Sequence, residues 1–290
     1  MAGARPPAVA GLFYPADAAA CAREIDRCCA GAGEPIPGGR TAVAAVAPHA
    51  GWSFSGAVLG AALRPLEAAD PDTVVLLGAD HHGILRGRCA VQPGDAWSTP
   101  LGDAPLDAEF GRALAGDPAA GAVLDAAPHA PEHSLEVIVP FLLRRLPRAR
   151  IVAVVVPPGT GTAAGAAAAR AVRRLGRRAV AIGSSDLTHY GDRYGFAPRG
   201  TGAGAHRWSR EVNDRTVLDP LLALDAAAIE PAARRHHSAC GPGALAAAAA
   251  FARESGATEA RLIRHTTSAE VLRESEPSLW VGYAALAWFA

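Results

Sequence analysis

The sequence has few cysteines, and their arrangement excludes a disulfide-stabilised domain. None of the five shows C-x-x-C spacing, and their density is far below that of a small secreted scaffold. We therefore interpret them as reduced thiols. They are Cys21, Cys28, Cys29, Cys89 and Cys240.

The sequence also lacks an excess of charge and a long apolar run. Lysine plus arginine and aspartate plus glutamate number 28 each, which leaves no net field that would attract nucleic acid or an anionic membrane. No stretch approaches the roughly 18 unbroken apolar residues that a membrane span requires, and no apolar signal segment opens the chain. We expect a cytoplasmic protein with no nucleic-acid or membrane partner, which acts on a small molecule or another protein.

Apolar, β-branched runs alternate with helical patterns along the chain. The runs cover residues 41–48, 73–78, 149–158 and 178–185, and the helical patterns cover 54–66, 133–146 and 161–175. Such alternation indicates a largely parallel sheet covered by helices on both faces. The segments 259–267 and 279–289 are predicted to add strands. Residues 1–290 are thus predicted to form a single α/β domain with a central, mostly parallel or mixed sheet flanked by helices.

Polar side chains follow several of these predicted strands. His49 follows the first run, His81 and His82 follow the second, and Asp186 and His189 follow "AVAIGSS". Ligands of open α/β sheets bind beyond the carboxyl ends of the strands. The sequence therefore predicts one rim that gathers these side chains.

The stretch "GADHHG" contains two adjacent histidines. Neighbouring side chains on extended backbone point to opposite sides, so at most one histidine is expected to face a given site. Asp80 would support a ligating imidazole by accepting its distal N–H. The alternative for Asp80 is a local turn-forming role.

The stretch "HAPEH" has the H-x-x-E-H spacing of a zinc motif at His129, Glu132 and His133. That motif needs both histidines on one helix face, and Pro131 disfavours helical backbone at Ala130. We reject a zinc protease on this ground. Glu132 and His133 are instead expected in the opening turn of the predicted helix, from which they would line the rim.

The stretch "GSSDLTHYG" offers Asp186 and His189 as an acid/base pair. A Ser-His-Asp hydrolase that uses Ser184 or Ser185 is the competing interpretation. The sequence has no G-x-S-x-G elbow, which argues against it. A turn-forming aspartate is the structural alternative for Asp186.

Cys240 stands directly before Gly-Pro-Gly and a long alanine-rich segment. Proline in the first turn marks a helix N-terminus, whose dipole favours a thiolate. A thiolate binds metal ions or attacks electrophiles, whereas the alternative is a buried, inert cysteine. The neighbouring His236 and His237 are expected in solvent or behind the site.

Seven stretches, in this order, resemble the MEMO family, the second component of the AmmeMemoRadiSam systems. They are "AGLFYPAD", "PHAGWSFSG", "LGADHH", "EHSLEVIVPFL", "SSDLTHYG", "CGPGALAAA" and "LWVGYAA", and they span most of the chain. The family is similar in fold to the class III extradiol non-haem iron dioxygenases. The resemblance implies the same fold here, with a mononuclear metal site on the predicted rim.

Carried over by position, the resemblance implies His49, His81 and Cys240 as metal ligands. It implies His189 as the acid/base histidine, with Asp186 beside it. A thiolate with two imidazoles suits iron or copper, Fe(II) above all, and zinc stays open by ligand type. The implied partners are a small, aromatic substrate or a peptide, and the other AmmeMemoRadiSam components.

The sequence departs from the family pattern at four positions. Trp52 and Phe54 stand where many members carry tyrosines, and Ala79-Asp80 replaces the usual Pro-Ser before the two histidines. We expect a more apolar pocket lined by Trp52 and Phe54, and an added negative charge from Asp80 near the metal. His82 is expected to stand behind the ligands or in solvent.

Three functions compete on this basis. The leading hypothesis is a redox enzyme with a ferrous or copper centre, and the second is a protein that holds metal or peptide in the same pocket without turnover. A two-metal phosphoesterase is the third, but it needs several more aspartates than Asp80 and Asp186.

Overall fold

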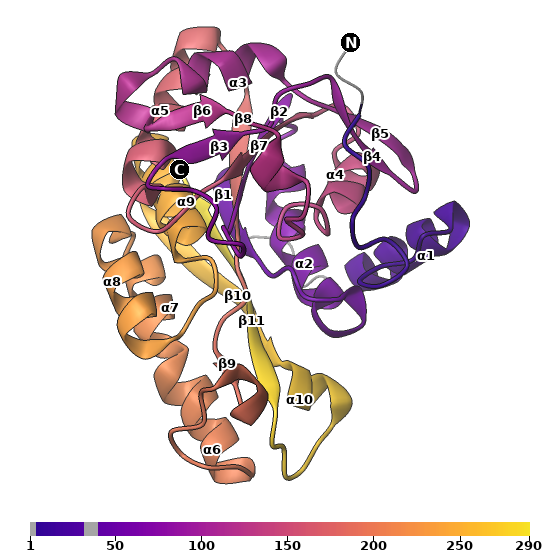
Figure 1. The fold of residues 1–290 in the computed structure, drawn as a ribbon, viewed down its shortest axis with the longest axis vertical. Coiled ribbons are helices and arrows are strands. Elements are labelled where there is room, and N and C mark those ends of the chain that lie inside the picture. Colours follow the sequence, from indigo (N-terminus) through magenta and orange to yellow (C-terminus); the bar gives the residue numbers. More distant parts are fainter. Residues whose placement is uncertain (1–3, 32–39) are drawn as a thin grey trace.

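A central mixed β-sheet crosses the molecule, and helices pack against both of its faces (Figure 1). The structure is a computed structural model that describes residues 4–31 and 40–290. Within these residues the main sheet has the strand order β10-β11-β1-β8-β2-β7-β3-β6, with β9 paired to β11. The bounds of its strands are β1 Ala42–Ala47, β2 Thr73–Gly78, β3 Cys89–Val91, β6 Ala122–Leu124, β7 Arg150–Val155, β8 Ala179–Ser184, β9 His189–Tyr190, β10 Glu259–Thr267 and β11 Trp280–Phe289. A separate hairpin pairs β4 (Ala96–Thr99) with β5 (Gly102–Pro105).

The strand directions confirm the predicted mixed sheet. The central strands β1, β8, β2 and β7 run parallel, whereas β11 is antiparallel to β1 and β10, and β3 is antiparallel to β7. Parallel neighbours bring the carboxyl ends of β1, β2 and β8 to one edge of the sheet. That edge carries the functional side chains described below.

Most of the helices form two layers, one on each face of the sheet. Their bounds are α1 Ala18–Ala30, α2 Trp52–Glu67, α3 Ala108–Ala115, α4 Val139–Arg145, α5 Gly161–Leu175, α6 Ala203–Trp208, α7 Arg215–Leu222, α8 Ala226–His236, α9 Pro242–Glu254 and α10 Ser268–Leu272. Side chains of α1, α2 and α4 share one core cluster, and those of α3, α5, α7, α8 and α9 share the other.

The alanine-rich composition of α5 and α9 lets these helices approach closely. A Cβ atom placed on Gly165 of α5 would lie 1.9 Å from the carbonyl oxygen of Ala247 in α9. Only glycine allows this approach, because any side chain would meet the backbone of the partner helix. The contact holds α9, and hence its N-terminal end beside Cys240, against the sheet.

The helix predicted over residues 133–146 is shorter than expected. It begins at Val139, and residues 134–138 form successive tight turns, with the amide of Val137 bonded to the carbonyl of His133. A helix begun at His133 would place Pro140 in its interior, where the proline ring clashes with the carbonyl four residues earlier. A start at Val139 puts Pro140 in the first turn.

The strands β3, β4, β5, β6 and β9 were not predicted. Each has two to four residues, too few to carry a periodic pattern. The backbone of Ala130 also differs from expectation, because it has helical φ and ψ angles of −57° and −49° although Pro131 follows it.

Among the residues described, no helix combines the length and the apolar character needed to cross a bilayer.

Candidate metal centre

Three side chains from distant parts of the chain meet at the carboxyl edge of the parallel strands. His49 follows β1, His81 follows β2, and Cys240 precedes α9. One donor atom from each lies within 4.8 Å of the others. Asp186 and His189, from the segment after β8, form a second group with Cys240 within the same limit. The structure thus brings the sequence-predicted residues into one cluster.

His49 is buried, and its hydrogen bonds indicate which ring nitrogen carries the proton. The Ser184 hydroxyl lies 2.9 Å from His49 Nδ1 and donates to the carbonyl of Ser134 at 2.6 Å. Ser184 must therefore accept a hydrogen bond from Nδ1–H, which leaves the Nε2 lone pair free. Nε2 lies 3.3 Å from Cys240 Sγ. The same bonds weigh against the Ser-His-Asp alternative, because the Ser184 proton is directed to a main-chain carbonyl.

His81 is oriented by Glu132, which lies 51 residues further along the chain. Glu132 Oε1 lies 2.9 Å from His81 Nδ1, and Oε2 accepts the His81 amide at 3.0 Å. This pairing fixes the proton on Nδ1 and leaves Nε2 for a metal. Burial opposes charge on His81, but hydrogen bonds with Cys240 and Glu132 raise its pKa to about 10. Burial likewise opposes charge on Glu132, yet the hydrogen bond from His81 holds its pKa far below the usual range.

The expected roles of Asp80 near the metal were wrong. Its carboxylate accepts the amides of Ile84 and Leu85 and closes the loop after β2. Asp80 is therefore the turn residue of the alternative interpretation, and Glu132 is the carboxylate that supports His81. His82 points away, exposed, with Nε2 3.3 Å from the carbonyl of Pro131.

The Cys240 thiol lies among polar groups of neighbouring segments. Beside His49, the Ser185 hydroxyl lies 3.8 Å from Sγ. Burial raises the pKa of Cys240, but the charge of His49 and the nearby rings of His189 and His81 bring it well below the ordinary value. The predicted position before a helix N-terminus is confirmed, with Gly241 as N-cap and Pro242 in the first turn. A thiolate, the metal-binding form, is therefore favoured at this position.

His189 belongs to the same cluster and has a buried ring nitrogen with no hydrogen-bond partner in residues 4–31 and 40–290. This atom is Nε2, and it lies 3.9 Å from Asp186 Oδ2, beyond hydrogen-bond distance. Asp186 is buried and accepts the backbone amide of His49 at 2.9 Å. Burial opposes protonation of His189, but Cys240 and Asp186 nearby raise its pKa. His189 thus contacts the cluster directly, whereas Asp186 fixes the backbone of a candidate ligand.

A family model described as "Memo-like protein" matches residues 5–287 of this sequence. The chain belongs to the Memo-like family. A MEMO1 family protein of Thermococcus kodakarensis is 36% identical over 291 residues, which cover 97% of this chain and 98% of the relative. MEMO1 family proteins of Methanothermobacter thermautotrophicus and Methanopyrus kandleri are each 37% identical over 295 residues. Both alignments cover 97% of this chain, and they cover 99% of the first relative and 98% of the second.

Trp52 does not line the large cavity of this Memo-like chain, which is described below, contrary to our expectation. Its side chain is buried in the core, stacks on Tyr14 at 4.9 Å and donates from Nε1 to the carbonyl of Val137 at 3.0 Å. The reason is its place in the first turn of α2, on the side that faces α4. Phe54, two residues on, does line the pocket and is partly exposed.

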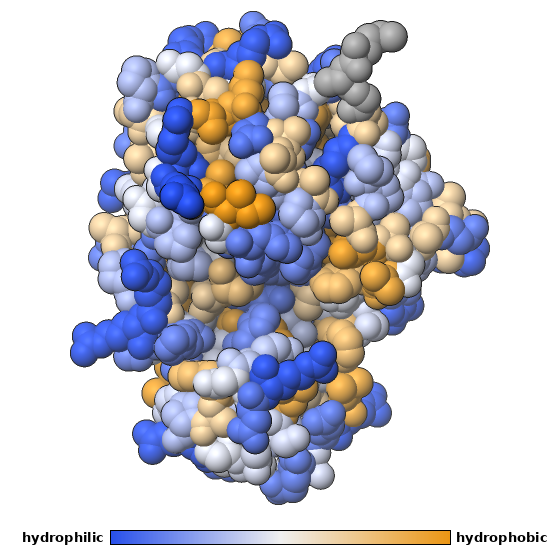
Figure 2. All heavy atoms as spheres, viewed as in Figure 1, coloured by the Kyte–Doolittle hydropathy of each residue, from blue (hydrophilic) through white to orange (hydrophobic). Residues whose placement is uncertain are grey.

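A cavity of about 710 Å³ opens in front of the candidate ligands. His49, His81 and His189 form part of its wall, together with Phe54 and His133. The His133 ring stacks on that of His81 at 4.9 Å. Figure 2 shows the surface hollowed between the body of the sheet and the part that holds β9, α6 and α10. The cavity gives a small molecule access to the cluster of this Memo-like protein.

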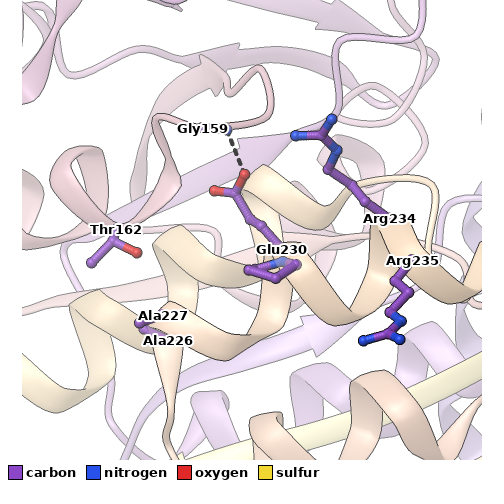
Figure 3. A pocket seen from close by; sticks show the side chains of 8 residues that line it. Gly159, Thr162, Ala226, Ala227, Glu230, Arg234 and Arg235 are labelled. Carbon is purple, nitrogen blue, oxygen red and sulfur yellow. Dashed lines mark hydrogen bonds between the residues drawn. The ribbon is translucent and has the colours of Figure 1, made fainter.

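A second large cavity, of about 610 Å³, lies between the start of α5 and α8 (Figure 3). None of the clustered histidines or Cys240 lines it. Its Glu230 carboxylate accepts the amides of Gly159 and Gly161, so the amides at the start of α5 already have a partner. We therefore place the candidate functional site of the Memo-like chain at the first cavity.

The donor set fits a transition-metal ion. In a tetrahedral shell, a thiolate sulfur and an imidazole nitrogen bound to one ion stand about 3.6 Å apart. The distance from His49 Nε2 to Cys240 Sγ is 3.3 Å, and the third donor lies within 4.8 Å. The ring of His189, which has a buried nitrogen without a partner among the residues described, adds a further candidate donor beside Cys240. One sulfur and two nitrogens favour iron, copper or zinc over magnesium or calcium.

Sequence reasoning missed two supporting residues, Glu132 as the partner of His81 and Ser184 as the partner of His49. Glu132 stood within a recognised motif, and Ser184 stood at the end of a predicted strand. Their roles depend on contacts across strands, for which no spacing along the chain is diagnostic.

Proposed function

We propose that this Memo-like protein is a mononuclear metal-dependent redox enzyme of the dioxygenase type. His49, His81 and Cys240 would hold the ion, iron above all or copper. The observation that carries the proposal is the buried His189 Nε2, which has no hydrogen-bond partner among the residues described, in a ring that lies beside Cys240 and lines the cavity. Most buried polar atoms have a partner, and the ring of His189, unlike the equally unpartnered His129 in the core, lines the large cavity beside Cys240.

A redox-active ion held there would supply one-electron chemistry and a binding position for dioxygen. The chain's own residues supply the remaining functions. Glu132 and Ser184 fix the tautomers of the two imidazoles, so that Nε2 of each is left free to bind an ion. His189 Nε2 accepts a proton from a bound hydroxyl group and returns it later, as a general acid/base does.

The cavity fits a small organic substrate. Its wall combines the rings of Phe13, Phe54 and Tyr194 with the guanidinium of Arg193 at the same opening. Aromatic walls favour a flat, partly apolar molecule, and we propose an aromatic small molecule as the substrate. The other AmmeMemoRadiSam components are proposed as protein partners on the family resemblance alone.

Metal content tests the first part of this proposal. Protein purified without oxygen is compared with Cys240→Ala and with Cys29→Ala, which removes a buried thiol distant from the cluster. We expect iron or copper near one equivalent in wild type and in Cys29→Ala, and a large loss in Cys240→Ala. Equal metal content in all three proteins would contradict the ligand assignment.

Turnover separates the redox enzyme from a protein that only holds metal or peptide. Iron-loaded wild type and His189→Ala are compared for oxygen consumption with a panel of aromatic diols and reductants. The proposal expects sustained consumption that His189→Ala lowers by about 10²–10⁴-fold while metal content is retained. Stoichiometric metal binding without consumption for any compound would favour the holding function.

A further inference from the structure

A third, smaller cavity reaches the candidate metal centre from another side. It has a volume of about 190 Å³, and Leu187, His189, Tyr194, Phe196, Ala239 and Cys240 contribute to its wall. Cys240 lines this small cavity, whereas His49, His81 and Asp186 line the large one. The thiol of Cys240 and the imidazoles of His49 and His81 therefore line different cavities.

Two aromatic rings separate the openings. His189 and Tyr194 line both cavities, and their rings pack edge to face with centroids 4.9 Å apart. Tyr194 follows β9 and is 42% exposed, so its ring stands between the cluster and solvent. The pair forms a partition with a cavity on each side.

Cys240 also differs from the other thiols of the chain. Cys21, Cys28, Cys29 and Cys89 are buried, whereas Cys240 is partly exposed. Its exposure is explained by the small cavity, whose wall it joins. The size of that cavity admits molecules of a few heavy atoms and excludes a substrate that would fill the large one.

We propose that the small cavity is a separate binding site and entrance for a molecule of a few heavy atoms, which reaches Cys240 and His189 without passing through the large cavity. Only the identity of this molecule rests on the function proposed above. In that function, dioxygen would enter through the small cavity and the organic substrate would enter through the large cavity. Two entrances allow the small molecule to arrive while the substrate fills the first cavity.

Alkylation of Cys240 in the metal-free protein tests this site without any turnover. Iodoacetamide forms an S–C bond with the thiol, iodide leaves and the thiol proton passes to the buffer. A fluorescein derivative of iodoacetamide has the same reactive group in a bulky form. Mass spectrometry of the Cys240 peptide gives the rate for each reagent, and the ratio of the two rates cancels changes in thiolate content.

Ala239→Leu narrows the small cavity, and Phe54→Trp is the matched substitution in the large one. We expect Ala239→Leu to lower the rate of Cys240 alkylation by iodoacetamide about tenfold, and Phe54→Trp to leave that rate unchanged. Phe196→Ala widens the small cavity, and we expect it to speed the bulky reagent by a similar factor. This third variant decides the matter if Ala239→Leu does not fold.

The proposal would be overturned if Phe54→Trp slowed the alkylation of Cys240 as much as Ala239→Leu does. It would also be overturned if neither Ala239→Leu nor Phe196→Ala changed the alkylation rates. Failure of the proposed function has a different signature. A protein without metal or oxygen consumption that still shows the expected alkylation pattern would retain the second entrance and lose only the assignment of dioxygen to it.

Discussion

His49 Nε2 lies 3.3 Å from Cys240 Sγ, although 191 residues separate the two along the chain. The pair joins the exit of β1 to the N-terminal end of α9, and its geometry depends on both elements. His49 is held by Ser184 and Asp186 from the β8 side, and Cys240 is held by the packing of α9 on the sheet. The residues that support these donors are therefore as testable as the donors themselves.

Glu132→Gln should weaken metal binding, because the amide cannot replace the carboxylate that orients His81 Nδ1. Loss of such a supporting carboxylate lowers metal affinity by about 10–100-fold. Competition with a chelator measures the affinity. Asp80→Asn is the matched control, since Asp80 bonds only loop amides, and it should leave the affinity unchanged. Equal losses in both variants would show that Asp80 acts on the site after all.

Trp52→Phe should lower stability without loss of metal. The substitution keeps an aromatic ring but removes the donor to the buried carbonyl of Val137, at an expected cost of about 1–3 kcal/mol. Urea unfolding gives the free energy. Phe54→Leu, at a partly exposed position, should cost less. A Trp52→Phe protein with wild-type stability and altered metal affinity would show that Trp52 acts on the metal site and not on the core.

His129 should make the metal-free protein less stable in acid. Burial lowers its pKa to about 4, from an ordinary value of 6.5, so the unfolded chain binds a proton that the folded chain does not. The contribution is fully present above pH 6.5 and falls as the pH drops to about 4, by about 3 kcal/mol in total.

Urea unfolding of wild type and His129→Gln between pH 7 and pH 4 measures this loss. Stability should fall less steeply with acid in the variant, by the equivalent of one proton. His82→Gln, at an exposed position, is the control and should follow wild type. Parallel profiles for wild type and His129→Gln would refute the assignment to His129.

Gly165→Ala should destabilise the protein by about 1–3 kcal/mol or more, because its methyl group would meet the backbone of α9. Gly204→Ala in α6 has open space around the new methyl group and should stabilise by about 0.5 kcal/mol. Thermal unfolding compares the two variants. Similar shifts in both would mean that α5 and α9 do not pack as closely as described.

The sequence predicted which side chains gather at one edge of the sheet, but not the residues that support them. His49, His81, His189 and Cys240 each stand at the end of an element, and the order of such ends along a parallel sheet brings them to one edge. The error at Asp80 arose because adjacency along the chain does not imply contact in space. A carboxylate next to a histidine can turn toward the loop, as Asp80 does, while Glu132 reaches the same histidine from another segment.

The error at Trp52 had a similar origin. A motif gives the order of residues, but the rotation of α2 decides which of them face the cavity. Trp52 and Phe54 are two positions apart on a helix and therefore point in different directions. The short strands were missed because two to four residues carry too little pattern to distinguish a strand from a turn.

The sequence by itself determined the alternation of strands and helices, the absence of disulfides and the ordered motifs of the Memo-like family, because these depend on local composition and spacing. Only the tertiary structure decided which carboxylate supports His81, where Trp52 lies and that two cavities reach the cluster. These features depend on contacts between segments far apart in the chain, and such contacts form only when the sheet and its helical layers pack together.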